Sequence, residues 1–348
     1  MAAVFDDSRL DDPAALAAAD WVLRPLAESG ARVRREAAEA SAAIATAAEA
    51  VADARPRAVV AAGPDSRLLR AVLEPWCPVP FVAWPAPSLP GWAGALDLVL
   101  VLAPVGSDTG AASAVAEAVR RGARLVVACP EGSLVADHAV GRDAAVLPAA
   151  GGDQLATAVV MLDFLDRVSL GPRTDPEGVA GALDEVAFAC SPQRDIAVNP
   201  AKMLAIALGD AIPLVWGGSV LAARAARRIA ESARRASGRA ALAGDAEHLL
   251  PVITAAAPPD LFADPFEGVD EGDEAPGRRP VLVVLDDGSE GAPVREQRER
   301  LVTAAHEHGV RVETVVRDVG DDVARYAALL ATGRYAAAYL GLALDRLG

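Results

Sequence analysis

The stretch VLVLAPVGSDTGAASAVAEAVRRGARLVVACP, residues 99–130, decides the fold. It opens with an apolar run, passes through a turn of small and polar residues, continues with alanine and valine at helical spacing, and ends in a second apolar run. Nearly continuous apolar runs are typical of strands in a parallel sheet that is covered on both faces. The stretch therefore predicts a strand, a turn at 106–110, a helix and a second, parallel strand joined by a right-handed crossover.

The same alternation continues on both sides of this stretch. The apolar runs of the first half predict strands at 58–62, 80–84, 96–103, 124–129 and 144–149, and a helix at 154–170. The second half predicts strands at 212–217, 239–244, 280–286 and 310–316, with two short helices within 320–332 and 335–346. The predicted fold class is therefore α/β, with two doubly wound, flavodoxin-like parallel-sheet domains.

The pattern also predicts how these domains are distributed along the chain. Alanine-rich helical periodicity at 13–28 and 33–52 indicates an N-terminal helical segment, residues 1–56. The first domain is expected at 57–170, a connector at 171–198 and the second domain at 199–348. Residues 258–279 are rich in proline, glycine and acid, and we expect them to form an insertion outside the core.

A weak internal repeat links the two halves. RAVVAAGPDSRLLRAVLE in the first half parallels IPLVWGGSVLAARAARRIAE in the second, each being a buried strand, a glycine turn and an amphipathic helix. Two similar α/β halves indicate a duplication, with a ligand site between the halves or between subunits.

Charge and composition exclude several classes of partner. A formal net charge of −15 disfavours nucleic acid and anionic membranes, because both repel an acidic surface. No apolar run reaches the ~18 residues of a membrane span, and the acidic N-terminus does not resemble a signal peptide. Cys77, Cys129 and Cys190 lie among apolar neighbours without CxxC spacing, which predicts buried free thiols. We therefore expect a cytoplasmic protein that binds neither nucleic acid nor membrane.

Two phosphate-binding motifs and a metal site are also disfavoured. No GxGxxG sequence follows a predicted strand, and Lys202, the one lysine of the chain, is followed by Met203 rather than by Ser or Thr. The four histidines do not have the spacing of metal ligands. We expect no cofactor and no metal.

The turn at 106–110 is a candidate anion site. A strand that ends at the start of a helix directs free backbone N–H groups and the positive end of the helix dipole at one point. Ser107 and Thr109 add two hydroxyl groups to that arrangement. The alternative is an ordinary N-cap that binds nothing, because serine and threonine are common at helix starts.

Three segments carry a resemblance to a known family. The hydroxyl-rich turn followed by RRGARLVVACPEGSL resembles the sugar isomerase (SIS) domain, in which such a turn holds a sugar phosphate. NPAKMLAIALGDAIPLVWGG, residues 199–218, is similar to the start of the C-terminal SIS domain of the bifunctional phosphoglucose/phosphomannose isomerases. Residues 312–344 resemble the end of that family, and the resemblance extends over the chain from about residue 57. It implies two SIS domains, a sugar phosphate as ligand, and a homodimer with its site near the subunit interface.

The resemblance assigns two catalytic residues. The segment AESAR, residues 230–234, corresponds to the family's NENxK-like segment and implies Glu231 as the base that moves a proton between C1 and C2. DAEHLL, residues 245–250, corresponds to an ELNHNE-like segment and implies His248 for ring opening, with Glu247 competing for that place. Both residues also have plain structural alternatives: Glu231 as one member of an arginine-rich solvated helix face, and His248 in the first turn of a helix.

The implied phosphate contacts come from two turns, and both depart from the family. They are Gly63, Ser66 and Arg67 in the first turn and Gly106, Ser107 and Thr109 in the second. The family turn is Ser-Gly-Asn-Thr, whereas here Asp108 precedes Thr109 and Asp65 lies in the other turn. Each aspartate would repel a phosphate charge about 4 Å away by about 4 kcal/mol at an effective dielectric constant of about 20.

Two further elements of the family are missing from this sequence. The Pro-Arg pair after the last strand of the first domain is replaced by GGDQLATAV, residues 151–159. The family's catalytic lysine beyond the Tyr-Leu motif is not found up to Gly348, and Lys202 is far from that place in the sequence.

The sequence therefore leaves two main functions open. The first is a phosphosugar isomerase that converts mannose 6-phosphate or glucose 6-phosphate to fructose 6-phosphate through an enediol. The alternative is a non-catalytic SIS-fold protein that binds a sugar phosphate or a nucleotide sugar and regulates a partner. A structural dimer with an inactive site is a third interpretation. The altered turns favour the alternative, whereas Glu231, His248 and NPAK favour the enzyme.

Overall fold

The computed structural model describes residues 4–51, 55–256 and 278–347 as two compact units. The first unit is Glu28–Asp184, and the second combines Met1–Ala27 with Glu185–Gly348. The sequence analysis groups residues 1–56 as one segment, whereas this division assigns residues 1–27 to the unit of the C-terminal half. None of the described helices is long and apolar enough to cross a membrane.

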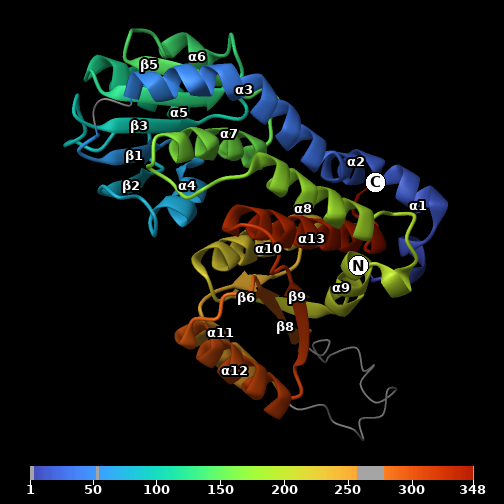
Figure 1. Cartoon of the computed structure of the whole chain (residues 1–348). Coiled ribbons are helices and arrows are strands. Elements are labelled where there is room, and N and C mark those ends of the chain that lie inside the picture. Colours follow the sequence, from blue (N-terminus) through green and yellow to red (C-terminus); the bar gives the residue numbers. More distant parts are fainter. Residues whose placement is uncertain (1–3, 52–54, 257–277, 348) are drawn as a thin grey trace, which may run out of the picture. The chain divides into compact units, whose positions relative to one another are not determined.

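The first unit contains a five-stranded parallel sheet (Figure 1). Its strands are β1 (Val59–Ala62), β2 (Phe81–Trp84), β3 (Leu98–Leu102), β4 (Arg124–Cys129) and β5 (Ala144–Pro148). Its helices are α3 (Ser29–Val51), α4 (Ser66–Leu73), α5 (Thr109–Arg120), α6 (Leu134–His138) and α7 (Gln154–Arg167). The strand order β2-β1-β3-β4-β5 is that of a flavodoxin-like doubly wound sheet.

Both faces of this sheet are covered, which is why the central strands are apolar at every position. β1 and β3 are buried throughout, and on one face they pack with β4 against α5 and α6. α7 packs against β3 and β4, and α3 packs against α7 and β5. The parallel sheet predicted from residues 99–130 is confirmed, with β3 and β4 paired from Leu98↔Arg124 to Leu102↔Ala128.

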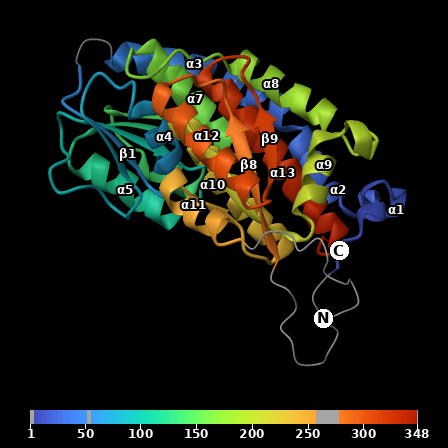
Figure 2. The same ribbon diagram turned by 90° about the horizontal axis from the view of Figure 1, so that it is seen from below.

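The second unit contains a four-stranded parallel sheet in the order β7-β6-β8-β9. The strands are β6 (Ala211–Gly217), β7 (Leu242–Ala243), β8 (Arg279–Asp286) and β9 (Arg311–Val316). Its helices are α1 (Pro13–Ala18), α2 (Asp20–Ala27), α9 (Pro200–Leu208), α10 (Val220–Ser237), α11 (Ala246–Thr254), α12 (Ala292–Glu307) and α13 (Asp322–Ala343). α11 and α12 cover one face, which is the side viewed in Figure 2, and α10 and α13 pack together on the other.

Two helices differ from the sequence expectations. Residues 171–198, expected as a connector, contain α8 (Pro176–Ala189). The two short helices expected at the end of the chain are one continuous helix, α13. Gly333 lies between the two expected ranges, where α13 crosses α10, and a Cβ at this position would collide with Ile229. The close crossing thus requires the glycine that otherwise weakens a helix.

The three cysteines are free thiols, as expected, although only two are fully buried. Cys129 and Cys190 are buried, and Cys77 is half-buried. Burial raises the pKa of the Cys190 thiol to about 11, so it stays protonated and unreactive at neutral pH. The insertion expected at 258–279 lies outside the described residues except for its last two, and Arg279 begins β8.

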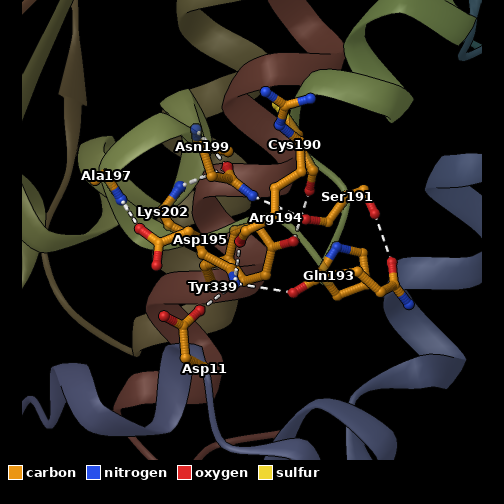
Figure 3. A network of polar contacts seen from close by, with 12 residues as sticks. Asp11, Cys190, Ser191, Gln193, Arg194, Asp195, Ala197, Asn199, Lys202 and Tyr339 are labelled. Carbon is orange, nitrogen blue, oxygen red and sulfur yellow. Dashed lines mark hydrogen bonds and ion pairs between the residues drawn. The ribbon is translucent and has the colours of Figure 1, made fainter.

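A buried lysine joins four segments of the second unit (Figure 3). Lys202 lies in the first turn of α9 with its side chain fully buried. Its Nζ donates to Asp11 Oδ1 at 2.6 Å, to Pro192 O at 2.9 Å and to Arg194 O at 2.8 Å. All three protons of the ammonium group are therefore satisfied, and the charge lies 5.6 Å from the ring centre of Tyr339 on α13.

Asn199 and Tyr339 complete the surroundings of this lysine. Asn199 caps α9 by accepting from the amides of Ala201 and Lys202 at 3.1 Å each, and its Nδ2 donates to Ser191 O at 3.0 Å. The Tyr339 hydroxyl donates to Cys190 O at 2.6 Å. The NPAK segment thus fixes the loop between α8 and α9 against α13.

We predict that Lys202→Met destabilises the protein by about 3 kcal/mol, because two carbonyl groups and one carboxylate lose their donor. The matched control is Arg24→Met, which removes an exposed ion pair with Asp20 and should cost less than about 1 kcal/mol. Chemical denaturation followed by circular dichroism measures both. If Lys202→Met loses no more free energy of unfolding than the control, the structural role of Lys202 is contradicted.

Candidate functional site

Two glycine turns meet at the carboxyl edge of the first sheet. β1 is followed by Gly63 and β3 by Gly106, and both glycines have positive φ, +88° and +73°. β1 and β3 are adjacent and parallel, with Ala62 opposite Val101, so their turns emerge side by side. An ideal Cβ on Gly110 would lie 3.9 Å from Pro64 Cδ, which shows that the turns touch. This point is where the strand order reverses, the usual ligand position in doubly wound sheets.

The six predicted phosphate contacts are brought together by these turns. Ser66 is the first residue of α4 and Thr109 the first residue of α5, so two helix N-termini begin here. Ser107, Thr109 and Arg67 are exposed, and within the described chain none of these side chains has a hydrogen-bond or ion-pair partner. We call Gly63–Arg67 with Gly106–Thr109 the cradle.

Ser66 has the least ordinary environment in the cradle. Its side chain is 1% exposed, and its Oγ has no hydrogen-bond partner among the described residues. A buried hydroxyl without a partner is costly, and a ligand oxygen can satisfy it. Around it, the amides of Ser66 and Leu68 already donate to Gly63 O and Asp65 O. The amides of Arg67, Thr109 and Gly110 have no acceptor within the described residues, so the cradle has donors to offer an anion.

The two acids of the cradle are held by internal partners. Asp108 is the N-cap of α5, and its Oδ1 accepts from Ala111 N at 2.6 Å. Asp65 accepts a hydrogen bond from Gln154 Nε2 at the start of α7. Asp108 thus uses one helix amide that a phosphate would otherwise share, and both carboxylates lie at the cradle.

Glu231 lies in the second unit, near the middle of α10. Its carboxylate is half-buried and forms an ion pair with Arg228, Nη1 to Oε2 at 2.6 Å. The helix begins at Val220, so at 1.5 Å per residue Glu231 lies about 16 Å along the axis from the carboxyl edge of the second sheet.

His248 lies at that carboxyl edge, in the first turn of α11. It is exposed, and its Cβ packs 3.4 Å from where Gly244 would carry a Cβ. Glu247 beside it is also exposed and pairs with Arg300 at 2.9 Å. His248 therefore lies at the carboxyl edge of the second sheet, whereas Glu231 lies well along α10 from that edge, and no hydrogen bond connects the two residues. Their catalytic roles remain predictions.

The switch point of the second sheet differs in chemistry from the cradle. Ser219 caps α10 after the Gly217-Gly218 turn, and its hydroxyl donates to Asp287 after β8. Asp286 forms an ion pair with Arg298, and Arg325 donates to Asp287 O at 2.7 Å. The polar groups here satisfy one another, whereas the cradle leaves hydroxyls without partners.

A buried acid lies beyond β5, at the same edge as the cradle. Glu36 of α3 is 0% exposed, and its Oε1 accepts from Gly151 N at 2.9 Å. Its Oε2 has no hydrogen-bond partner within the described residues. Burial raises the pKa of this carboxyl above its ordinary value, against the opposing effect of the Gly151 hydrogen bond.

Gln154 and Glu36 are the site features that the sequence analysis missed. Asp153 signals the start of α7, since it accepts from Leu155 N at 2.8 Å and Ala156 N at 3.0 Å. That signal does not reveal that Gln154 reaches Asp65, because β5 and β1 are separated by two strands in the sheet. Glu36 falls in a helix whose other charged residues are mostly exposed, so only packing distinguishes it.

The second half of the chain matches a known protein family. Residues 197–346 match the bacterial phospho-glucose isomerase C-terminal SIS domain. This match covers the segments NPAK and Tyr-Leu from which the sequence resemblance was drawn. A comparison of the sequence with curated proteins gives no match.

Solved structures of sugar-phosphate proteins have the same fold at low sequence identity. Tagatose-6-phosphate ketose/aldose isomerase from Escherichia coli is 12% identical, with a TM-score of 0.64 and 93% of each chain covered. The C-terminal domain of glucosamine-fructose-6-phosphate aminotransferase from Francisella tularensis is 10% identical, with a TM-score of 0.61 and coverage of 90% of this chain and 95% of that one. A glucose-6-phosphate isomerase like protein from Thermus thermophilus is 17% identical, with a TM-score of 0.50 and coverage of 89% and 92%.

The sheet topology and the comparisons define the fold class of this protein. It is an α/β protein with two SIS-like doubly wound parallel sheets and a helical N-terminal segment. More narrowly, residues 197–346 match the bacterial phospho-glucose isomerase C-terminal SIS domain, and the chain shares its fold with solved sugar-phosphate proteins.

We predict that Glu36→Gln stabilises the protein more at pH 7 than at pH 4. Burial raises the pKa of this carboxyl in the folded state, so the folded protein binds more protons than the unfolded chain. The free energy of unfolding therefore falls as the pH rises above the pKa of the carboxyl in the unfolded chain, about 4.3. The glutamine side chain carries no charge, so the variant avoids the cost of burying an ionised carboxylate at neutral pH. Thermal unfolding midpoints at both pH values measure the effect.

The matched control is Glu39→Gln, an exposed glutamate on the same helix. The effect of this substitution on the thermal unfolding midpoint should be the same at both pH values. If Glu36→Gln also shifts the midpoint equally at pH 4 and pH 7, the buried carboxyl is not the source of the pH dependence.

Proposed function

We propose that this protein binds a sugar phosphate in the cradle and interconverts mannose 6-phosphate or glucose 6-phosphate with fructose 6-phosphate. The observation that carries the proposal is the meeting of two hydroxyl-bearing turns at the β1/β3 switch point, with the buried Ser66 hydroxyl lacking a partner among the described residues. The SIS fold of sugar-phosphate proteins at similar length supports it.

In this proposal the cradle holds the phosphate by hydrogen bonds and one cation. Ser66, Ser107 and Thr109 donate hydroxyl protons, and the amides at the start of α4 and α5 add backbone donors. Arg67, exposed at the rim, supplies a positive charge that compensates part of the repulsion from the two aspartates.

The isomerisation itself needs a base that moves one proton between C1 and C2 and a group that opens the sugar ring. We assign these roles to Glu231 and His248, with Glu247 as the alternative to His248. A homodimer with the site near the subunit interface, in the cytoplasm, completes the proposal. No cofactor or metal takes part in it.

A second function is favoured by a specific observation. Asp65 and Asp108 keep two carboxylates at the cradle, and the Glu231 carboxylate is already paired with Arg228. Both features fit a SIS protein that binds a sugar phosphate without converting it and acts on a partner. Stabilisation by fructose 6-phosphate without turnover would select this function over the isomerase.

We predict that Asp108→Asn binds fructose 6-phosphate at least tenfold more tightly, a change of about 1.4 kcal/mol. Asparagine caps a helix as well as aspartate, so α5 keeps its start while one charge that repels phosphate is removed. Isothermal titration calorimetry measures the dissociation constant.

The matched control is Asp12→Asn, because Asp12 is the N-cap of α1 in the second unit and accepts from Ala14 and Ala15 amides. Its affinity for fructose 6-phosphate should equal that of the wild type. Equal affinity in the Asp108 variant as well would show that the phosphate does not bind at this turn.

We predict that Glu231→Gln lowers kcat for isomerisation by roughly 10²–10⁴-fold and leaves the affinity for fructose 6-phosphate nearly unchanged. The amide keeps the shape and hydrogen bonding of the side chain but cannot accept the C–H proton. A coupled assay of both sugar phosphates measures turnover, and calorimetry measures binding.

Glu117→Gln is the control, because Glu117 also pairs with an arginine three residues away within a helix, Arg120. It should keep wild-type turnover. Near-wild-type turnover of Glu231→Gln would remove Glu231 from the mechanism and leave the cradle proposal intact.

A further inference from the structure

The second unit contains a groove that the proposed function does not use. Its volume is about 370 Å³, and it lies among α2, α10 and α13, all within this unit. The walls include Trp21, Pro25 and Leu26 from α2 and Ala337 from α13, together with Arg235 and Arg334. This volume falls in the ~300–1,000 Å³ range of small-molecule pockets.

The two arginines of this groove are unpaired in an acidic protein. Both are exposed, and among the described residues neither has a hydrogen bond or an ion pair, although the chain has 48 acidic and 33 basic residues. Arg235 lies in the last turn of α10, where the helix dipole favours a cation. That explanation does not extend to Arg334.

Arg334 occupies an unusual place on its helix. α13 is buried on nearly all sides, and from Tyr326 to Leu344 Arg334 is the one exposed residue. Its neighbours Gly333 and Tyr335 are both buried. The one exposed side chain in this part of α13 is therefore a cation, and it lines the groove beside Ala337.

Trp21 provides a flat apolar surface beside the two cations. Its side chain is 66% exposed, and its Nε1 donates to Leu347 O at 3.1 Å, which fixes the polar edge of the ring. The face of a fixed indole can stack on a planar ring, and paired guanidinium groups bind phosphate oxygens with directed hydrogen bonds. The groove thus combines an aromatic platform with a charge of +2.

We propose that this groove binds a nucleoside monophosphate, with the base stacked on Trp21 and the phosphate held by Arg235 and Arg334. Two cations balance the charge of one phosphate group, which favours a monophosphate over longer phosphate chains. The site is separate from the cradle, and its occupancy does not depend on whether the protein acts on sugar phosphates.

Calorimetric titration of the full chain with AMP, GMP, CMP and UMP tests the proposal. At least one of them should bind, whereas adenosine and ribose 5-phosphate, each carrying half of the ligand, should bind at least tenfold more weakly. Arg235→Gln, Arg334→Gln and Trp21→Ala should each weaken nucleotide binding at least tenfold. Saturating fructose 6-phosphate should not displace the nucleotide.

Arg227→Gln is the matched control. Arg227 lies on the same helix as Arg235, is exposed, has no hydrogen bond or ion pair within the described chain, and does not line the groove. It should bind the nucleotide with wild-type affinity.

Several results would overturn the proposal. These are no binding of any of the four nucleotides at millimolar concentration, unchanged binding in both groove arginine variants, or an equal loss in Arg227→Gln. Displacement of the nucleotide by fructose 6-phosphate would place it in the cradle instead, and would leave the sugar-phosphate proposal standing.

Discussion

The parallel pairing of β1 with β3 is the constraint on which the candidate site depends. The chain leaves β1 toward β2 on one side and returns to β3 on the other. The turns after β1 and β3 therefore lie next to each other, while the connections that follow them lead to opposite sides. Parallel strands place their carboxyl ends at one edge, and the helices that follow direct their N-termini there. Ser66 and Thr109 therefore share one site although they are far apart in the sequence.

Electrostatics sets the character of that site. A phosphate cradle normally offers donors and positive charge, but here Asp108 and Asp65 add two carboxylates, each held by an internal hydrogen bond. Because Asp108 serves as the N-cap of α5, it stabilises the helix that would otherwise receive the phosphate. Under the proposed function, the same residue therefore favours the fold and opposes the phosphate ligand.

The second unit depends on a charge placed in its interior. Lys202 is fully buried, and burial of an ammonium group is tolerated only when its protons and its charge are satisfied. Asp11 and two carbonyl groups do this, and they come from the N-terminal segment and from the loop before α9. The lysine of the NPAK segment therefore has a structural role.

The sequence alone determined the alternation of strands and helices and the two parallel sheets, whereas the six cradle residues were assigned by the resemblance to a family. Apolar runs and glycine turns are local signals, so the strands, helices and sheets follow from short stretches. The tertiary structure decided what depends on residues distant in the chain: the partner of Asp65 on α7, the burial of Glu36, the continuity of α13 through Gly333, and the contact of Lys202 with Asp11. Two short helices were expected at 320–332 and 335–346, but the chain between them, including Gly333 packed close to Ile229, continues as one helix. Contacts and charge pairs between residues far apart in the chain leave no repeating pattern in the sequence, so only the folded structure reveals them.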